Sequence, residues 1–192
     1  MSTTIGVPVK PATLADLEAL PETVRGEIID GVLYTLPRPR AIHSASELRI
    51  GADVEGPFQR GRGGPGGWWI LVEPGITCPG SPEFSPDLAG WRRERLPRLP
   101  DTRIDVVPDW VCEVLSPSTR SYDQRVKRPF YARIGVLWLW YVDVDARTLS
   151  VNKLEGGRWV EWLVAGERDK VKPEPFDAVE LDLAGWWSEL PA

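Results

Sequence analysis

Apolar runs along the chain predict a series of short strands separated by glycine, proline and polar turns. Two early runs, at 24–29 and 32–36, flank Asp30-Gly31, a dipeptide that favours a tight two-residue turn, so a β-hairpin is predicted there. The run at 110–115 is uninterrupted, which is typical of a strand buried on both faces of a sheet. Further strands are predicted at 68–72, 76–78, 88–91, 138–144, 148–154 and 159–164.

Three segments have helical patterns. Residues 11–20 predict a short helix with Thr13 as its N-cap. A helix over 42–58 would place four apolar residues on one face, namely Ile42, Ala45, Leu48 and Ala52. A third helix follows Ser116-Pro117-Ser118-Thr119 and ends at Gly135, and Pro129 is expected to kink its first turns or mark where its regular part begins.

Composition limits the class of protein. The chain has 192 residues, 42% of them hydrophobic, and ten tryptophans, so we expect one globular domain over residues 1–192. The sequence lacks the pattern of a signal peptide and a run of the ~20 apolar residues that span a membrane, so we expect a cytoplasmic protein. Cys78 and Cys112 form no CxxC pair and are expected to be reduced, packed thiols.

Charge is unevenly distributed. The net charge of −5 argues mildly against a nucleic-acid partner, yet residues 92–133 carry ten basic and six acidic side chains. Within this basic third we expect four arginines to contact phosphates: Arg92, Arg93, Arg120 and Arg125. An ordinary solvated basic surface is the alternative.

Two carboxylates have an unusual setting. Glu113 lies within an apolar run that a Ser-Pro-Ser-Thr turn then breaks, and Asp87 follows Ser85-Pro86 just before another apolar run. A carboxylate is costly to bury without a partner. Paired carboxylates on neighbouring strands bind Mg²⁺ or Mn²⁺, which can activate a water for phosphodiester hydrolysis.

Lys127 is the candidate base or positive charge for this chemistry. It follows Asp123 by four residues, so a surface ion pair with Asp123 is the structural alternative. Ser116 and Ser118 could be nucleophiles, but they flank a proline and lack a Gly-x-Ser-x-Gly elbow, which favours a turn role.

Motifs in order along the chain resemble the Uma2 family, which belongs to the PD-(D/E)xK restriction-endonuclease-like superfamily. The resemblance covers about residues 12–187, and its most specific part is Glu-x-Leu-Ser-Pro-Ser-Thr beginning at Glu113. The other matching segments are Gly26-Glu27-Ile28-Ile29-Asp30-Gly31, His43, Ser85-Pro86-Asp87, Asp123 with Lys127, Tyr131-Ala132, Gly135-Val136 and Trp140-Tyr141-Val142-Asp143.

The resemblance implies an α/β (α+β) fold, with a mixed four-stranded sheet flanked by helices and an N-terminal β-hairpin. It implies that Asp87, Glu113 and the backbone carbonyl of Val114 hold the metal, and that Lys127 is the catalytic lysine. In the wider superfamily the lysine lies two residues after the second acid, where this chain has Leu115.

Supporting roles remain open for several further positions. Glu27 could reach the metal or make a strand-edge hydrogen bond. His43, the only histidine, suits a helix-capping or buried hydrogen-bonding role. Tyr131 and Ser116 are possible supporting residues. The apolar pair Leu137-Trp138, unusual for the family, fits either an oligomer contact or extra core packing.

The leading hypothesis is a Mg²⁺- or Mn²⁺-dependent endonuclease that hydrolyses DNA. A homodimer is expected because cutting two strands needs two active sites, and no membrane partner is expected. The alternative is a nuclease-fold protein that binds DNA or a protein partner without cutting. The negative net charge favours this alternative, and the set of two acids and a lysine opposes it.

Overall fold

A mixed sheet of six strands forms the centre of the molecule, in the order β10-β9-β8-β7-β6-β3. The computed structural model describes residues 10–36 and 40–188, so the expected domain limits at 1 and 192 lie outside the described residues. Only β7 and β8 run parallel, while the other neighbours in this sheet are antiparallel. The strands are β3 (Trp68–Val72), β6 (Leu88–Arg92), β7 (Trp110–Leu115), β8 (Trp138–Asp143), β9 (Thr148–Glu155) and β10 (Arg158–Ala165).

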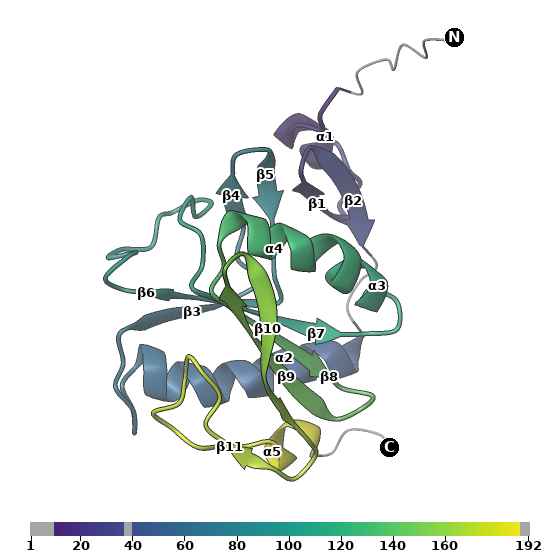
Figure 1. The fold of residues 1–192 in the computed structure, drawn as a ribbon. Coiled ribbons are helices and arrows are strands. Elements are labelled where there is room, and N and C mark those ends of the chain that lie inside the picture. The colour runs from purple at the N-terminus through teal and green to yellow at the C-terminus, as the bar shows by residue number, and fades with distance from the viewer. Residues whose placement is uncertain (1–9, 37–39, 189–192) are drawn as a thin grey trace.

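Helices cover both faces of this sheet (Figure 1). One face carries α2 (Ala41–Val54), its extension η1 (Glu55–Gln59) and α5 (Ala184–Trp187). The other carries α3 (Arg120–Tyr122), η2 (Asp123–Lys127) and α4 (Arg128–Ile134). The expected class, a mixed sheet flanked by helices, is confirmed, but the sheet has six strands rather than four. No helix among the described residues is long and apolar enough to cross a bilayer.

β7 separates two apolar clusters. All six of its residues are buried, as its uninterrupted apolar sequence predicts. Trp110, Cys112 and Val114 join the cluster on the α2 side, whereas Val111 and Leu115 join the one on the α4 side. Since successive side chains of a strand point to opposite faces, Glu113 belongs to the α4 face.

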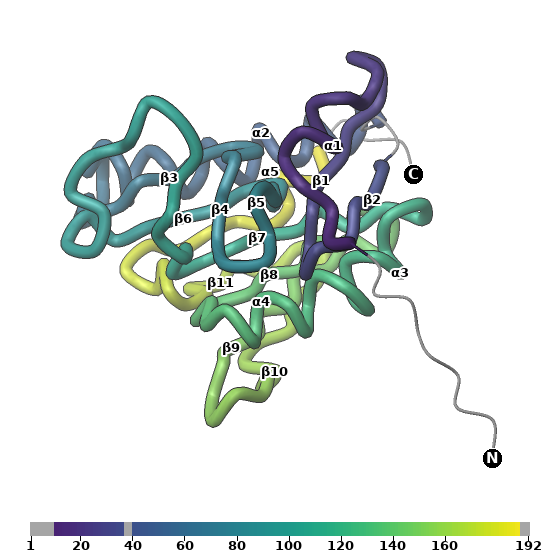
Figure 2. Tube along the Cα trace, turned by 90° about the horizontal axis from the view of Figure 1, so that it is seen from above, coloured from purple at the N-terminus to yellow at the C-terminus, as the bar shows by residue number. Residues whose placement is uncertain are grey.

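A smaller sheet lies beside the central one, in the order β2-β1-β5-β4. The predicted hairpin is confirmed: β1 (Arg25–Ile29) and β2 (Val32–Leu36) are antiparallel, and Asp30 and Gly31 have φ values of 54° and 74°, as a tight turn requires. The helix α1 (Leu14–Glu18) begins at a capping box of Thr13 and Asp16 and lies near this hairpin (Figure 2). The other two strands are β4 (Ile76–Cys78) and β5 (Ser81–Phe84).

The apolar face expected for the helix over 42–58 is not the buried face of α2. Leu48 is 71% exposed and Ala52 is also exposed. The buried face instead consists of His43, Ser46, Glu47, Ile50, Gly51 and Val54. Three of these six are polar, so an apolar stripe was the wrong signal for the orientation of this helix.

The helical segment after β7 ends as predicted. Gly135 closes α4 in the left-handed conformation, with φ of 88°, and Pro129 lies in the first turn of α4. The segment before it, η2, is a π-helical turn rather than α-helix. Sequence patterns missed four elements of only two to four residues each: β5, α5, β11 (Lys170–Val171) and β12 (Leu181–Asp182).

For the apolar pair Leu137-Trp138, the sequence left open either an oligomer contact or extra core packing, and the structure places the two side chains differently. Trp138 is 9% exposed and belongs to the apolar cluster on the α2 side, whereas Leu137 is 46% exposed. Trp138 therefore contributes core packing, and only Leu137 is available for a contact with another molecule.

Candidate active site

A small cavity of about 40 Å³ opens where the ends of β6 and β7 meet α2 and η2. It has room for a few water-sized groups. Asp87, Glu113 and Lys127 all line it, so the structure brings together the three residues that the sequence singled out as catalytic. The full lining is Arg25, Leu36, Arg40, His43, Ser85, Asp87, Glu113, Ser116, Ser118, Thr119, Tyr122, Asp123 and Lys127.

Asp87 is held in place through both of its oxygens. Oδ2 accepts a hydrogen bond of 2.7 Å from the backbone N–H of Val114, and Oδ1 lies 3.3 Å from Nε2 of His43. Burial raises the pKa of Asp87, but the hydrogen bond and charge of His43, the charge of Lys127 and the hydrogen bond from Val114 together lower it overall. Asp87 is therefore a carboxylate whose orientation is fixed by the neighbouring strand.

Glu113 is 1% exposed and its oxygens are fully engaged. Lys127 Nζ lies 3.1 and 3.2 Å from its two oxygens, and the hydroxyl of Tyr131 donates a short hydrogen bond to Oε1. Burial raises the pKa of Glu113 well above its usual value, although Lys127 opposes that shift. Tyr131, a possible supporting residue by sequence, thus positions the Glu113 carboxyl group.

Lys127 is a buried cation, not a surface residue. It is 3% exposed, and Nζ also donates to the carbonyl of Ser85 at 3.1 Å and lies 3.4 Å from Oε1 of Glu27. Burial lowers its pKa, but the surrounding carboxylates, Glu113 first, raise it well above the usual value. The alternative of a surface ion pair with Asp123 is wrong, since both residues are buried.

Glu27 makes a hydrogen bond to the backbone and also faces the catalytic lysine predicted from the sequence. Its Oε2 accepts a hydrogen bond from the backbone N–H of Ser85 at 3.1 Å, and its Oε1 faces Lys127. It is 1% exposed. Glu27 therefore connects the hairpin β1–β2 to the loop before Asp87 and to the lysine.

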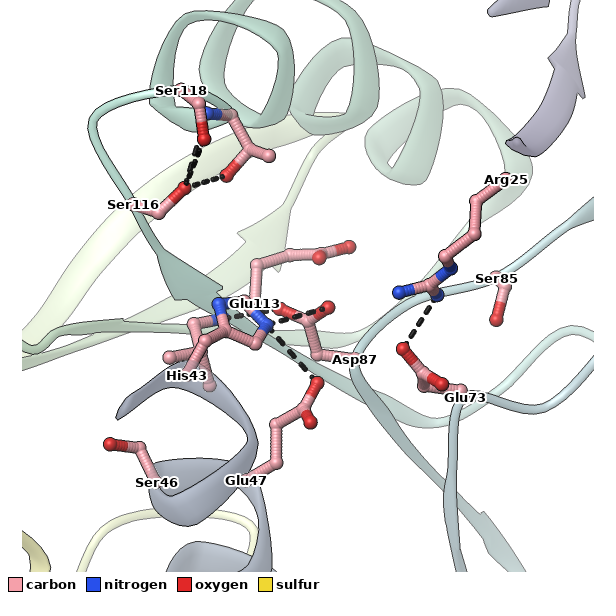
Figure 3. A network of polar contacts seen from close by, with 12 residues as sticks. Arg25, His43, Ser46, Glu47, Glu73, Ser85, Asp87, Glu113, Ser116 and Ser118 are labelled. Carbon is pink, nitrogen blue, oxygen red and sulfur yellow. Dashed lines mark hydrogen bonds and ion pairs between the residues drawn. The ribbon is translucent and has the colours of Figure 1, made fainter. Parts of the chain in front are cut away.

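His43 lies inside the site, between two carboxylates (Figure 3). Its Nε2 is 3.1 Å from Oε1 of Glu47 and 3.3 Å from Oδ1 of Asp87. Burial lowers the pKa of His43, but hydrogen bonds to these two carboxylates raise it to about 10. The expected buried hydrogen-bonding role fits this geometry.

Glu47 is a site residue that sequence reasoning missed. It is 5% exposed, and burial raises its pKa despite the hydrogen bond with His43. Its spacing of four residues from the only histidine, within a predicted helix, was the available signal. That signal was obscured because the apolar stripe pointed to another face.

The site has more carboxylates than cations. Among the described residues, Glu27, Glu47, Asp87, Glu113 and Asp123 are clustered around two buried basic groups, His43 and Lys127. Burial raises the pKa of Asp123 to about 6, with Lys127 opposing the shift. A cluster with this surplus of negative charge is suited to a divalent cation.

Ser116 holds the turn after β7. Its hydroxyl lies 3.0 Å from Oγ of Ser118 and 2.9 Å from Oγ1 of Thr119, and it also accepts from the backbone N–H of Thr119 at 3.3 Å. These contacts match the turn role expected from the flanking proline.

The four arginines chosen from charge alone are not at the cavity. Arg92 lies at the other end of β6, and Arg93 is stacked 4.1 Å from the ring of Trp69. Arg120 forms an ion pair of 2.6 Å with Asp143. Arg125 lines a separate surface pocket, which includes Tyr34 and Phe130.

Two other arginines, which the sequence did not indicate, line the cavity. Arg25 forms an ion pair of 2.5 Å with Glu73, and Arg40 is exposed at the beginning of α2. Both come from the N-terminal quarter of the chain, where the acidic residues outnumber the basic ones. Regional charge was therefore a poor guide to the charges at the cavity.

Comparisons with known proteins agree with this architecture. A sequence profile of the family Uma2, described as "putative restriction endonuclease", matches residues 12–184. A crystal structure of a "putative nuclease belonging to DUF820" from Anabaena variabilis is similar, with a TM-score of 0.70 and 24% identity. The match covers 93% of this chain and 98% of that one, and establishes a shared fold. Comparison with curated proteins gave no match.

Proposed function

We propose, because this chain belongs to the Uma2 family, that it is a divalent-metal-dependent endonuclease that hydrolyses phosphodiester bonds in DNA. The observation that carries this proposal is the convergence of Asp87, Glu113 and Lys127 on one cavity, with the lysine 3.1 Å from Glu113. Two acids and a lysine are the residue types that metal-assisted hydrolysis of a phosphodiester requires.

Asp87 and Glu113 would hold Mg²⁺ or Mn²⁺, with the backbone carbonyl of Val114 as a third oxygen ligand. The donor set fits a hard cation, because the cluster offers carboxylate oxygens in excess of its own positive charges. When bound, such a cation supplies Lewis acidity at the phosphate and lowers the pKa of water.

Lys127 would stabilise charge during the reaction. Its raised pKa keeps the ammonium group protonated at neutral pH, so its role is to face the negative charge that develops on phosphate oxygens. Tyr131 orients Glu113 through its hydroxyl, and the hydrogen bond from Val114 orients Asp87. Arg25 and Arg40 lie where they could contact the phosphates on either side of the cleaved bond.

Two strands of DNA would be cut by two copies of the site, which favours a homodimer as the active form. The structure describes one chain, and the solution mass in the presence of DNA tests this part of the proposal.

The test of activity is conversion of supercoiled plasmid to nicked and linear forms with Mn²⁺ or Mg²⁺. We expect cleavage by the wild type, loss with EDTA, and loss in Asp87→Asn and Glu113→Gln, which keep the shape of each side chain. Glu155→Gln, an exposed acid on β9, is the matched control and should cleave normally. A folded wild type that binds plasmid but leaves it intact would instead support the non-cutting alternative.

A further inference from the structure

The buried face of α2 carries two potential metal ligands, His43 and Glu47, that have no role in the metal site proposed above for Asp87 and Glu113. Nε2 of His43, one carboxylate oxygen of Glu47 and one of Asp87 all lie within 4.8 Å of one another. Figure 3 shows His43 and Glu47 rising from α2 toward Asp87. We propose that His43, Glu47 and Asp87 together bind a divalent transition-metal ion, with Mn²⁺ favoured over Mg²⁺.

The hydrogen bonds around the two assigned acids support this proposal independently. The Oδ2 atom of Asp87 is occupied by the N–H of Val114, so Oδ1 is the atom directed toward His43. Both oxygens of Glu113 are occupied by Lys127, and Tyr131 adds a further bond to one of them. Oδ1 of Asp87 therefore faces His43 on α2, and Glu113 is not needed to complete the ligand set of His43, Glu47 and Asp87.

Helix geometry prearranges the two new ligands. His43 and Glu47 are separated by four residues in a regular helix of 14 residues, so their side chains lie on one face whether or not a metal is present. They are 8% and 5% exposed. Without a metal, His43 is partnered by Glu47 and Asp87 through its Nε2, and a bound cation would displace the Nε2 proton and take its place between the imidazole and the two carboxylates.

The chemical class of the ion follows from the nitrogen ligand. Imidazole is a favourable ligand for transition metals, whereas Mg²⁺ binds oxygen and retains much of its water. A site with one imidazole and two carboxylates thus discriminates in favour of Mn²⁺. The proposal rests on the proposed function only in that both use Asp87.

Electron paramagnetic resonance of the full chain with Mn²⁺ tests this assignment directly. We expect the electron spin echo of bound Mn²⁺ to show modulation from an imidazole nitrogen in the wild type. His43→Gln should abolish this modulation and weaken Mn²⁺ binding about tenfold or more, while leaving weak Mg²⁺ binding little changed. Glu47→Gln should also weaken Mn²⁺ binding. Glu55→Gln, at the partly buried acid that follows α2 and pairs with Arg60, should not.

The outcome separates this assignment from the proposed nuclease activity. The Glu113→Gln variant should lose plasmid cleavage and still show nitrogen modulation, because Glu113 is outside the His43 ligand set. If bound Mn²⁺ shows no nitrogen modulation, or if His43→Gln binds Mn²⁺ as tightly as the wild type, the inference is overturned. In that case His43 only forms hydrogen bonds with Glu47 and Asp87 and binds no metal. Plasmid cleavage, if observed, would still support the proposed nuclease activity.

Discussion

The two π-helical turns among the described residues share a backbone conformation but bury different kinds of side chain. Both η1 and η2 are five residues long, begin with an acid and have a proline in or just after the turn. η1 buries Phe58 in the apolar cluster on the α2 side, whereas η2 buries Asp123 and Lys127 beside the cavity. Although π-turns are often associated with functional sites, the comparison shows that the buried side chain, and not the turn itself, distinguishes site from core.

The prolines give a physical reason for both turns. In a regular α-helix, the ring of Pro129 would clash with the carbonyl of Arg125, four residues earlier, and could not donate a hydrogen bond to it. Pro57 has the same relation to Asp53. A wider turn relieves this conflict, and Lys127 in η2 and Phe58 in η1 are among the side chains that these turns bury.

The largest expected effect comes from removing the lysine of η2. Lys127→Met should lower plasmid cleavage by about 10²–10⁴-fold, because the charge facing the phosphate is lost. Since this change leaves Glu113 buried without its cation, the variant's thermal unfolding must be measured alongside. Lys170→Ala, an exposed lysine, is the control and should keep full activity. A folded Lys127→Met variant that cleaves at the wild-type rate would contradict the assigned role.

The corresponding change in η1 should affect stability alone. Phe58 is 1% exposed, and its ring centroid lies 4.7 Å from that of Phe176. Phe58→Ala should lower the free energy of unfolding by about 3–5 kcal/mol, because it leaves a cavity in the core. Urea denaturation measures this loss, and Phe58→Leu should recover most of it. A change in Mn²⁺ affinity of the folded variant would show that η1 also influences the site.

The acids that begin the two turns should differ in their dependence on pH. In the folded protein the pKa of Asp123 is raised from 3.8 to about 6. Burial is the main cause, the charges of Asp87 and Glu27 add to it, and Lys127 and the Thr119 hydrogen bond lower the pKa in part. The native state therefore binds more protons than the unfolded chain between about pH 4 and pH 6, so this group's contribution to stability falls as pH rises through that window.

Replacing Asp123 with asparagine should remove this dependence. Relative to the wild type, Asp123→Asn should gain stability on the order of 2 kcal/mol between about pH 4 and pH 6. Urea denaturation at several pH values gives the difference between the two proteins, in which the other titrating groups largely cancel. Parallel pH profiles for the two proteins would show that Asp123 is not the source.

The smallest effect is expected at the first residue of η1. Glu55 forms an ion pair of 2.5 Å with Arg60, whose side chain is 55% exposed. Glu55→Gln should change the free energy of unfolding by less than about 0.5 kcal/mol, because water screens exposed pairs. A loss of more than 1 kcal/mol in thermal or urea unfolding would mean that the pair supports the turn.

Local sequence signals predicted most of the fold. The strand at 110–115, the Asp30-Gly31 turn and the helix end at Gly135 each depend on residues within one element, and all three are confirmed. Four short elements were missed because two to four residues repeat a strand or helix pattern too few times to distinguish it from the flanking turns. The outer strands β3 and β10 were predicted as strands, but their membership of one six-stranded sheet depends on long-range pairing.

The site was less predictable than the fold. Asp87, Glu113 and Lys127 could be named because an acid beside an apolar run is conspicuous and because the motif order matches a family. Glu47 was missed because only the apolar positions of its helix were considered, and Glu47 lies on the face that carries His43. The arginines expected to contact phosphates were selected by regional charge, which takes no account of the distance along β6 that separates Arg92 from Asp87.

The location of Lys127 on a helical turn, and not on β7, has a consequence for how the family can change over time. Glu113 pairs with Tyr141 of β8 and lies on a strand that also pairs with β6, so moving it would disturb the sheet. The lysine is connected to β7 only through the turn at 116–119 and the helical segment that follows. One inserted or deleted residue there would rotate it by about 100° around the helix axis without altering the sheet. A change in the length of this connection can therefore reposition Lys127 while Glu113 stays in place. The connection is the part of the site that can vary without a change in the sheet.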